Sequence, residues 1–135
     1  LYRSDDAGET WKHVFDQEAW IFNVAVSATG TVYCPGANLW KSTDRGETWR
    51  RLTDFSDLIS IVGLEIDPGD EDRIWLSRVA WASKAAGGVY ETSDGGKSWH
   101  EITGDLPYCK PLVLRFNPAT NELWAGGVGL FKLKR

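Results

Sequence analysis

Several features are missing from this sequence of 135 residues, and each absence removes a class of protein. No apolar run approaches the roughly 20 residues that cross a bilayer, and no segment reads as a signal peptide. No apolar period of 3.6 residues persists over three turns, so no helix is predicted. Acidic residues outnumber lysine and arginine by 19 to 15, and this balance opposes binding to nucleic acid phosphates.

Methionine is absent altogether. A natural reading frame starts with one, so we expect the first residues of the gene product to be missing. The only cysteines, Cys34 and Cys109, fall in repeat units two apart, which predicts that they do not pair. The two histidines, His13 and His100, have no partners at metal-ligand spacing. The sequence therefore indicates no metal and no cofactor. The acidic stretch DPGDED (67–72) could hold calcium through its oxygen atoms, but the equivalent segments of the other repeats are plain turns, which favours a turn here as well.

Aromatic residues are abundant, with eight tryptophans, and one polar turn is spelled three times. The three copies are SDDAGETW (4–11), STDRGETW (42–49) and TSDGGKSW (92–99). Their last tryptophans are spaced by 38 and 50 residues. An apolar residue followed by an aromatic one begins ten positions before each, and a fourth such pair lies near the C-terminus: Leu1–Tyr2, Leu39–Trp40, Val89–Tyr90 and Leu130–Phe131. Such self-similarity indicates a repeat architecture.

Two further blocks recur in register with this turn and read as strands. They are 22–30, 62–70 and 112–120, then 31–36, 73–78 and 122–127. Each is rich in β-branched and aromatic residues and is bounded by Gly, Pro, Asn or Asp. One unit then holds four strands, A to D, which in the second unit are 20–27, 31–34, 38–42 and 48–53. Four antiparallel strands in about 40 residues predict an all-β fold of β-propeller blades.

The recurring turn must reverse the chain between strands C and D. Its Asp and Ser or Thr side chains can accept hydrogen bonds from backbone N–H groups. Its fifth position is always glycine, which allows a positive φ. This pattern resembles the Asp-box, or BNR, repeat. That repeat occurs in the propellers of sialidases, xyloglucan-degrading glycosidases, sortilin-type receptors and a photosystem II assembly factor. The resemblance extends over essentially the whole chain and implies a secreted or periplasmic location.

In that family the box is a structural turn at the blade periphery. The resemblance therefore implies structural rather than catalytic roles for the matching residues. They are Ser4, Asp6, Gly8, Thr10, Trp11, Ser42, Asp44, Gly46, Thr48, Trp49, Thr92, Asp94, Gly96, Ser98 and Trp99.

The strand count predicts about three blades, whereas closed propellers use roughly four to eight. The predicted units are the end of a blade (1–18), two blades (19–54 and 55–104) and an incomplete last blade (105–135). An open arc leaves sheet faces bare. We therefore expect either the C-terminal part of a longer propeller, which the start in mid-blade favours, or further copies of the chain that close the ring.

Two tryptophans, Trp20 and Trp81, have no counterpart in the other units. Trp81 lies in an insertion (77–88) that makes its B–C connection eight residues longer than the others. Propeller geometry places D–A and B–C connections on one face, opposite the box turns, and loops on one side of a scaffold often carry binding. We predict partial exposure of both tryptophans and a ligand site formed with Arg78, Asp57, Asp105, Tyr108 and Lys110, near Asp16, Glu18 and Lys84. The alternative is that both tryptophans simply pack under their loops.

The sequence thus favours a binding or assembly module whose ligand is a glycan or a protein. The alternative is a glycoside hydrolase that uses Asp57 and Asp105 as its carboxylate pair, which requires a separation of roughly 5 to 9.5 Å. The Arg-Ile-Pro motif of the sialidases is not found. Xyloglucanase sites lie between two complete propellers, more than this stretch of chain supplies.

Overall fold

The computed structural model describes residues 1–16, 20–57, 59–81, 87–106, 110–127 and 129–134. None of these residues is helical, and within these ranges no helix could cross a membrane. The strands are β1 (Tyr2–Arg3), β2 (Lys12–His13), β3 (Ala25–Val26), β4 (Val32–Pro35), β5 (Leu39–Ser42), β6 (Arg50–Arg51), β7 (Ser60–Asp67), β8 (Asp70–Val79), β9 (Gly87–Thr92), β10 (His100–Glu101), β11 (Val113–Asn117), β12 (Glu122–Gly126) and β13 (Leu130–Lys134). The predicted all-β class is confirmed.

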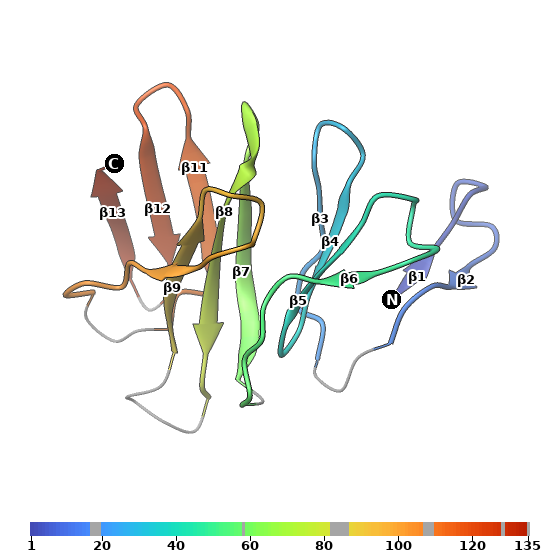
Figure 1. Ribbon diagram of the computed structural model, residues 1–135, viewed down its shortest axis with the longest axis horizontal. Helices are drawn as coiled ribbons and strands as arrows, with labels where there is room; N and C mark the ends of the chain where they lie inside the picture. Colours follow the sequence, from blue (N-terminus) through green and yellow to red (C-terminus); the bar gives the residue numbers. More distant parts are fainter. Residues whose placement is uncertain (17–19, 58, 82–86, 107–109, 128, 135) are drawn as a thin grey trace.

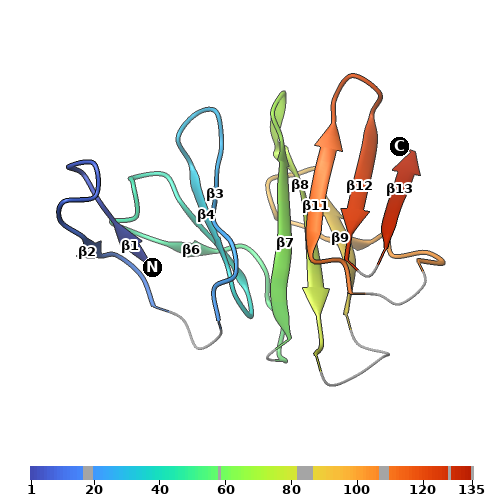
Figure 2. The same cartoon turned by 180° about the vertical axis from the view of Figure 1, so that it is seen from behind.

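The described strands form antiparallel sheets that follow one another along the chain. Their strand orders are β1-β2, β3-β4-β5-β6, β10-β9-β8-β7 and β11-β12-β13. Figure 1 shows the sheets side by side, with β1-β2 at one end of the row and β11-β13 at the other, and Figure 2 shows the same arrangement from behind. In both four-stranded sheets each strand pairs with its neighbour in sequence, which is the topology of propeller blades.

The hydrophobic core lies between successive sheets. The first cluster joins the second and third sheets and contains Tyr33, Leu39, Leu52, Ile61, Leu64, Ile74 and Leu76. The second joins the third and last sheets and contains Trp75, Val89, Leu114, Leu123 and Ala125. The strand B aromatics of the two complete sheets, Tyr33 and Trp75, are fully buried. Each sheet is therefore stabilised mainly by the sheets on either side of it, as in repeat proteins.

Strand A of the second unit is shorter than predicted, since β3 covers Ala25–Val26 and the prediction of 20–27 is wrong at its start. The N–H of Val24 donates to Oδ1 of the adjacent Asn23 at 2.8 Å, which removes it from the ladder. On the facing strand β4, Pro35 has no backbone N–H and cannot donate a hydrogen bond. Pairing with β4 therefore begins only at Ala25, opposite Tyr33.

Each box turn is closed by its own side chains. In the second turn the N–H of Gly46 donates to Ser42 Oγ at 2.7 Å, and the N–H of Thr48 donates to Asp44 Oδ1 at 2.9 Å. Gly46 has a φ of +88°, a conformation that favours glycine. The first and third turns repeat these hydrogen bonds. The box aspartates are thus occupied by the turn itself, as the repeat implies.

The tryptophan that ends the box binds the preceding sheet. Trp49 Nε1 donates to the carbonyl of Val14 at 3.2 Å, and Trp99 Nε1 donates to the carbonyl of Leu52 at 3.2 Å. In both cases the acceptor lies three residues after the previous box tryptophan. The repeated turn therefore joins blades to one another as well as reversing the chain.

The box aspartates predict sensitivity to acid. Hydrogen bonds from the Thr10 and Thr48 side chains lower the pKa of Asp6 and of Asp44 to about 2, and Ser98 lowers the pKa of Asp94 in the same way. Their stabilisation is present above the ordinary pKa of 3.8 and is lost as pH falls toward the lowered values. Urea midpoints measured from neutral pH down to about 2 should decline over that window. An Asp44→Asn variant should show a shallower decline, and parallel curves would contradict the assignment.

Candidate functional site

Three exposed aromatic side chains gather at one end of the sheets. Trp20 precedes β3 and Trp81 follows β8, and the start of β3 and the end of β8 lie at the same end of the molecule, opposite the β5–β6 turn (Figure 1). The exposed fractions are 77% for Trp20, 42% for Phe22 and 56% for Trp81. The ring of Phe22 lies between the other two, with centroids 5.9 Å from Trp20 and 6.0 Å from Trp81. We call these three residues the aromatic cluster.

The rings of the aromatic cluster do not form one flat surface. Phe22 is inclined by 50° to Trp20 and by 51° to Trp81. Tilted pairs of this kind place the electropositive edge of one ring near the electronegative face of the next. The cluster therefore presents several small apolar faces at different angles, and contiguous exposed apolar groups of this kind mark interaction surfaces.

Sequence reasoning missed Phe22, because it stood in a recurring strand block. A signal was nevertheless present. The equivalent positions in the other units hold Val62, which is buried, and the aliphatic Leu112, so Phe22 is the aromatic exception at its repeat position. A residue that departs from the pattern of its repeat is therefore a candidate for a local role.

Lys110, one of the residues predicted for the ligand site, lies beside the aromatic cluster. Its Nζ donates to the carbonyl oxygen of Trp81 at 3.1 Å. The bond connects the end of β8 to the chain that leads into β11, so it holds the Trp81 turn against the last sheet. It also places a positive charge at the border of the aromatic cluster.

Arg78 lies beneath this face rather than on it. Its side chain is 7% exposed, its guanidinium is 3.7 Å from the ring centroid of Phe55, and it forms an ion pair with Asp57. An arginine stacked on an aromatic ring and paired with a carboxylate satisfies most of its buried charge. Arg78 Nε has no hydrogen-bond partner among the described residues. The Arg78–Asp57 pair therefore joins the connection after β6 to the end of β8, directly before the insertion.

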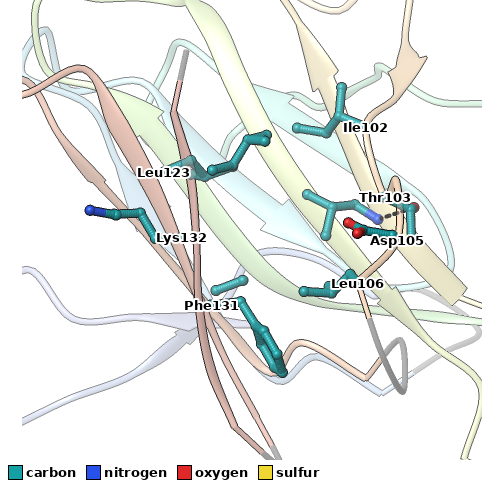
Figure 3. Close-up of a pocket in the computed structure, with 10 residues that line it drawn as sticks. Ile102, Thr103, Asp105, Leu106, Leu123, Phe131 and Lys132 are labelled. Carbon is teal, nitrogen blue, oxygen red and sulfur yellow. Dashed lines mark hydrogen bonds between the residues drawn. The ribbon is translucent and has the colours of Figure 1, made fainter.

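Asp105 has different surroundings from Asp57. It lines a cavity of about 310 Å³ between the end of the β9-β10 unit and the strands β12 and β13 (Figure 3). Asp57 is instead held by Arg78. The two carboxylates of the predicted catalytic pair thus have different surroundings.

Tyr108, Glu18 and Lys84 lie outside the described residues, as does Cys109. Cys34 is buried in β4. His13 Nε2 lies 3.0 Å from Asp16 Oδ1, and the side chains of both residues are exposed.

The acidic stretch 67–72 is organised as a turn. Asp67 Oδ1 accepts the N–H of Gly69 at 2.9 Å, and Asp70 Oδ1 accepts the N–H of Asp72 at 3.1 Å. Asp67 also accepts a hydrogen bond from Arg73. Within the described ranges, no three His, Cys, Asp or Glu side chains are grouped closely enough to hold a metal ion. These carboxylates instead bind backbone and arginine donors.

Comparisons with known proteins agree with this architecture. An ancestral GH74 enzyme superposes on 97% of the chain with a TM-score of 0.76 and 22% identity, but only 19% of the enzyme is covered. The GH74 xyloglucanase from Xanthomonas campestris gives a TM-score of 0.75 and 21% identity over 97% of the chain and 23% of the enzyme. YCF48 bound to D1 peptide gives 0.62 and 19% over 84% of the chain and 36% of that protein.

The chain thus spans between about a fifth and a third of the solved structures that it resembles. No curated protein matches it by sequence. Residues 1–123 match the family model Sortilin-Vps10, described as sortilin, neurotensin receptor 3. Together with the three box turns and the blade topology, this match confirms the Asp-box prediction: the chain belongs to the Sortilin-Vps10 family of β-propellers.

Proposed function

We propose that this chain is a binding module whose aromatic cluster contacts an extended segment of a partner polypeptide. The observation that carries the proposal is the gathering of Trp20, Phe22 and Trp81 at one end of the sheets, each at least 42% exposed. Leaving such large apolar side chains in water is unfavourable, and covering them with a ligand recovers roughly 25 cal/mol per Å² of buried apolar surface. Trp20 and Phe22 precede β3 and Trp81 follows β8, so the rings are carried by chain that adjoins the ends of two neighbouring sheets.

The shape of the aromatic cluster favours a polypeptide over a glycan. A sugar ring stacks best on one flat aromatic face, whereas faces tilted by about 50° fit apolar side chains that project in different directions. Lys110, beside Trp81, can pair with an acidic group of the ligand. The family description names a neurotensin receptor, and one propeller of the same fold, YCF48, has been solved bound to a D1 peptide.

Glycoside hydrolysis is the second candidate, because the GH74 enzymes share the fold. A shared fold does not imply that two proteins catalyse the same reaction. The reaction needs two carboxylates that face one substrate, and Asp57 is bound to Arg78 while Asp105 lines a separate cavity. If the hydrolase candidate holds, Asp57→Asn or Asp105→Asn abolishes release of oligosaccharides from xyloglucan.

The binding proposal is tested with substitutions in the aromatic cluster. Peptides are selected from a library of extended random sequences on the wild-type protein, and their affinity is measured by calorimetry. Trp20→Ala and Trp81→Ala should each weaken binding by roughly 1 to 3 kcal/mol, which is typical of interface aromatics. Trp11→Ala is the matched control, because Trp11 is also exposed, at 63%, but belongs to a box turn.

Equal affinities for wild type, Trp20→Ala and Trp81→Ala would reject the aromatic cluster as the site. Loss of affinity in Trp11→Ala alone would move the site to the box turns. If xyloglucan oligosaccharides bind tightly and no binding peptide can be selected, the ligand of the aromatic cluster is a glycan and not a polypeptide.

A further inference from the structure

Two cations lie directly opposite one another on β5 and β6. Lys41 pairs with Arg50 in the register of these strands, so both side chains project from the same face of the sheet. Like charges at opposite positions repel each other and destabilise a sheet. Both residues line a groove of about 330 Å³ together with Thr43, Thr48 and Trp49. The groove lies beside the β5–β6 turn, at the end of the sheets opposite the aromatic cluster (Figure 1).

The first repeat unit has the same pair of cations and shows what such a pair binds. Arg3 lies opposite Lys12 at the equivalent positions of β1 and β2. Glu47, from the box turn of the second unit, bridges them, 3.1 Å from Arg3 Nη1 and 2.9 Å from Lys12 Nζ. Asp5 gives Arg3 a second carboxylate at 2.9 Å. Carboxylates thus offset the repulsion between the two cations of the first unit.

Both of these carboxylates are replaced in the second unit. Thr43 stands at the position of Asp5, and Lys97 stands at the position of Glu47. We call Lys41, Arg50 and Lys97 the basic cluster. Of the residues that the structure describes, none forms an ion pair with a member of the basic cluster. The second unit therefore keeps the cations of the first and lacks the acidic groups that neutralise them.

The third box turn packs on the second sheet as the second box turn packs on the first sheet. A Cβ on Gly46 would lie 3.5 Å from Val14 Cβ, and a Cβ on Gly96 would lie 3.2 Å from Leu52 Cβ. Val14 and Leu52 are equivalent positions, each three residues after a box tryptophan. Lys97 directly follows Gly96, so the backbone of the third turn brings a third positive charge to the place where the second turn supplies a carboxylate.

The basic cluster is accessible to a ligand. Arg50 and Lys97 are exposed, and Lys41 is half-buried, with its Nζ 5.4 Å from the ring centroid of Tyr33. Glu71 is near enough for its charge to interact with that of Lys41, but its carboxylate accepts the N–H of Thr29 at 3.1 Å. A carboxylate that arrives from solvent can therefore contact all three cations.

We propose that the basic cluster binds a glutamate or aspartate side chain of a partner polypeptide, as Arg3 and Lys12 bind Glu47. Arginine offers paired donors that match a carboxylate, and lysine adds a point charge. The group bound at the equivalent place in the first unit is itself a side-chain carboxylate, which favours an acidic segment of polypeptide. This surface is separate from the aromatic cluster and does not depend on the proposed function.

The test compares two substitutions that change the net charge equally. Lys97→Glu places a carboxylate at the position equivalent to Glu47, where it occupies Lys41 and Arg50 from within the chain. Arg51→Glu is the matched control. Arg51 is also exposed and adjoins Arg50, but successive side chains of a strand project from opposite faces.

The probe is a blocked peptide of alternating glutamate and glycine, and the same peptide with glutamine in place of glutamate is its control. Amide chemical shifts of the isotope-labelled protein verify the fold of each variant. They also give the affinity for the peptide and the position at which it binds.

Wild type and Arg51→Glu should bind the glutamate peptide with similar affinity, and the shift changes should centre on the basic cluster. Lys97→Glu should bind it at least about tenfold more weakly, and so should wild type the glutamine peptide. A folded wild type that does not bind the glutamate peptide overturns the proposal. Equal weakening in Lys97→Glu and Arg51→Glu also overturns it, because net charge alone then explains the binding.

Inorganic phosphate distinguishes a polypeptide carboxylate from a free anion. At the same ionic strength, phosphate should shift the amides of the basic cluster only at concentrations at least about tenfold above those of the glutamate peptide. If phosphate binds there as tightly as the peptide, the site takes a free oxyanion and the polypeptide partner is overturned.

Discussion

Gly63→Ala is expected to destabilise the protein by about 2 to 4 kcal/mol, far more than a typical glycine to alanine change in a strand. A Cβ on Gly63 meets the Ser77 hydroxyl and lies 3.2 Å from Leu114 Cγ. The Ser77 hydroxyl cannot move away freely, because it accepts the N–H of Gly63 at 2.9 Å and donates to the carbonyl of Pro111 at 2.6 Å. The substitution therefore disturbs a buried bond between the third sheet and the last one.

Gly126→Ala is the matched control for this substitution. Gly126 also lies in a strand, but a Cβ there has no heavy atom within 4 Å. Urea unfolding should give a midpoint close to wild type for Gly126→Ala and a strongly reduced one for Gly63→Ala. Similar reductions of the urea midpoint in the two variants would show that backbone entropy in the strand, and not the contact between sheets, determines how strongly Gly63→Ala destabilises the protein.

Trp75→Ala is expected to cost about 3 to 5 kcal/mol, the range for a fully buried aromatic residue. Trp75 is 0% exposed, and its ring centroid lies 4.5 Å from that of Phe116 in the next sheet. Its Nε1 donates to Glu91 at 2.9 Å, and Arg73 stacks over the ring at 4.6 Å. Truncation therefore leaves a cavity, and it also removes the hydrogen-bond donor of Glu91 and the ring on which Arg73 stacks.

The control for this second variant is Trp124→Ala, at the same repeat position in the last sheet. Trp124 is only half-buried, and Lys132 lies 5.3 Å from its ring. Its replacement should cost about 1 kcal/mol or somewhat more, in proportion to the smaller burial. Equal losses for Trp75→Ala and Trp124→Ala would contradict the view that packing between sheets holds the arc together.

Local chemistry explains why so much of the fold could be predicted from the sequence. The box turn closes through hydrogen bonds between residues two to four positions apart, so its letters alone specify it. Because the strand blocks recur in register with the turn, the order in which the strands pair could be predicted from the repeat. Prediction failed at the start of strand A, where the Asn23 side chain takes the N–H of Val24, a local bond that strand propensity does not register.

The candidate site was harder to predict, because its contacts join residues far apart in sequence. Trp20 and Trp81 were identified because they break the repeat, but Phe22, which connects them, was not. Arg78 was predicted to be a surface cation, as arginine usually is. Its burial depends on Phe55 and Asp57, which reach it from the connection between two other strands.

The central claim is that partner polypeptides bind at the aromatic cluster, and oxidative footprinting of the tryptophans tests it most directly. The wild-type protein is oxidised with and without a saturating selected peptide, and the extent of oxidation of each exposed indole is measured by mass spectrometry. Trp20 and Trp81 should be protected by the peptide, while Trp11, similarly exposed but on a box turn, should be oxidised as in the free protein. Unchanged oxidation of Trp20 and Trp81 in the saturated complex would contradict the account.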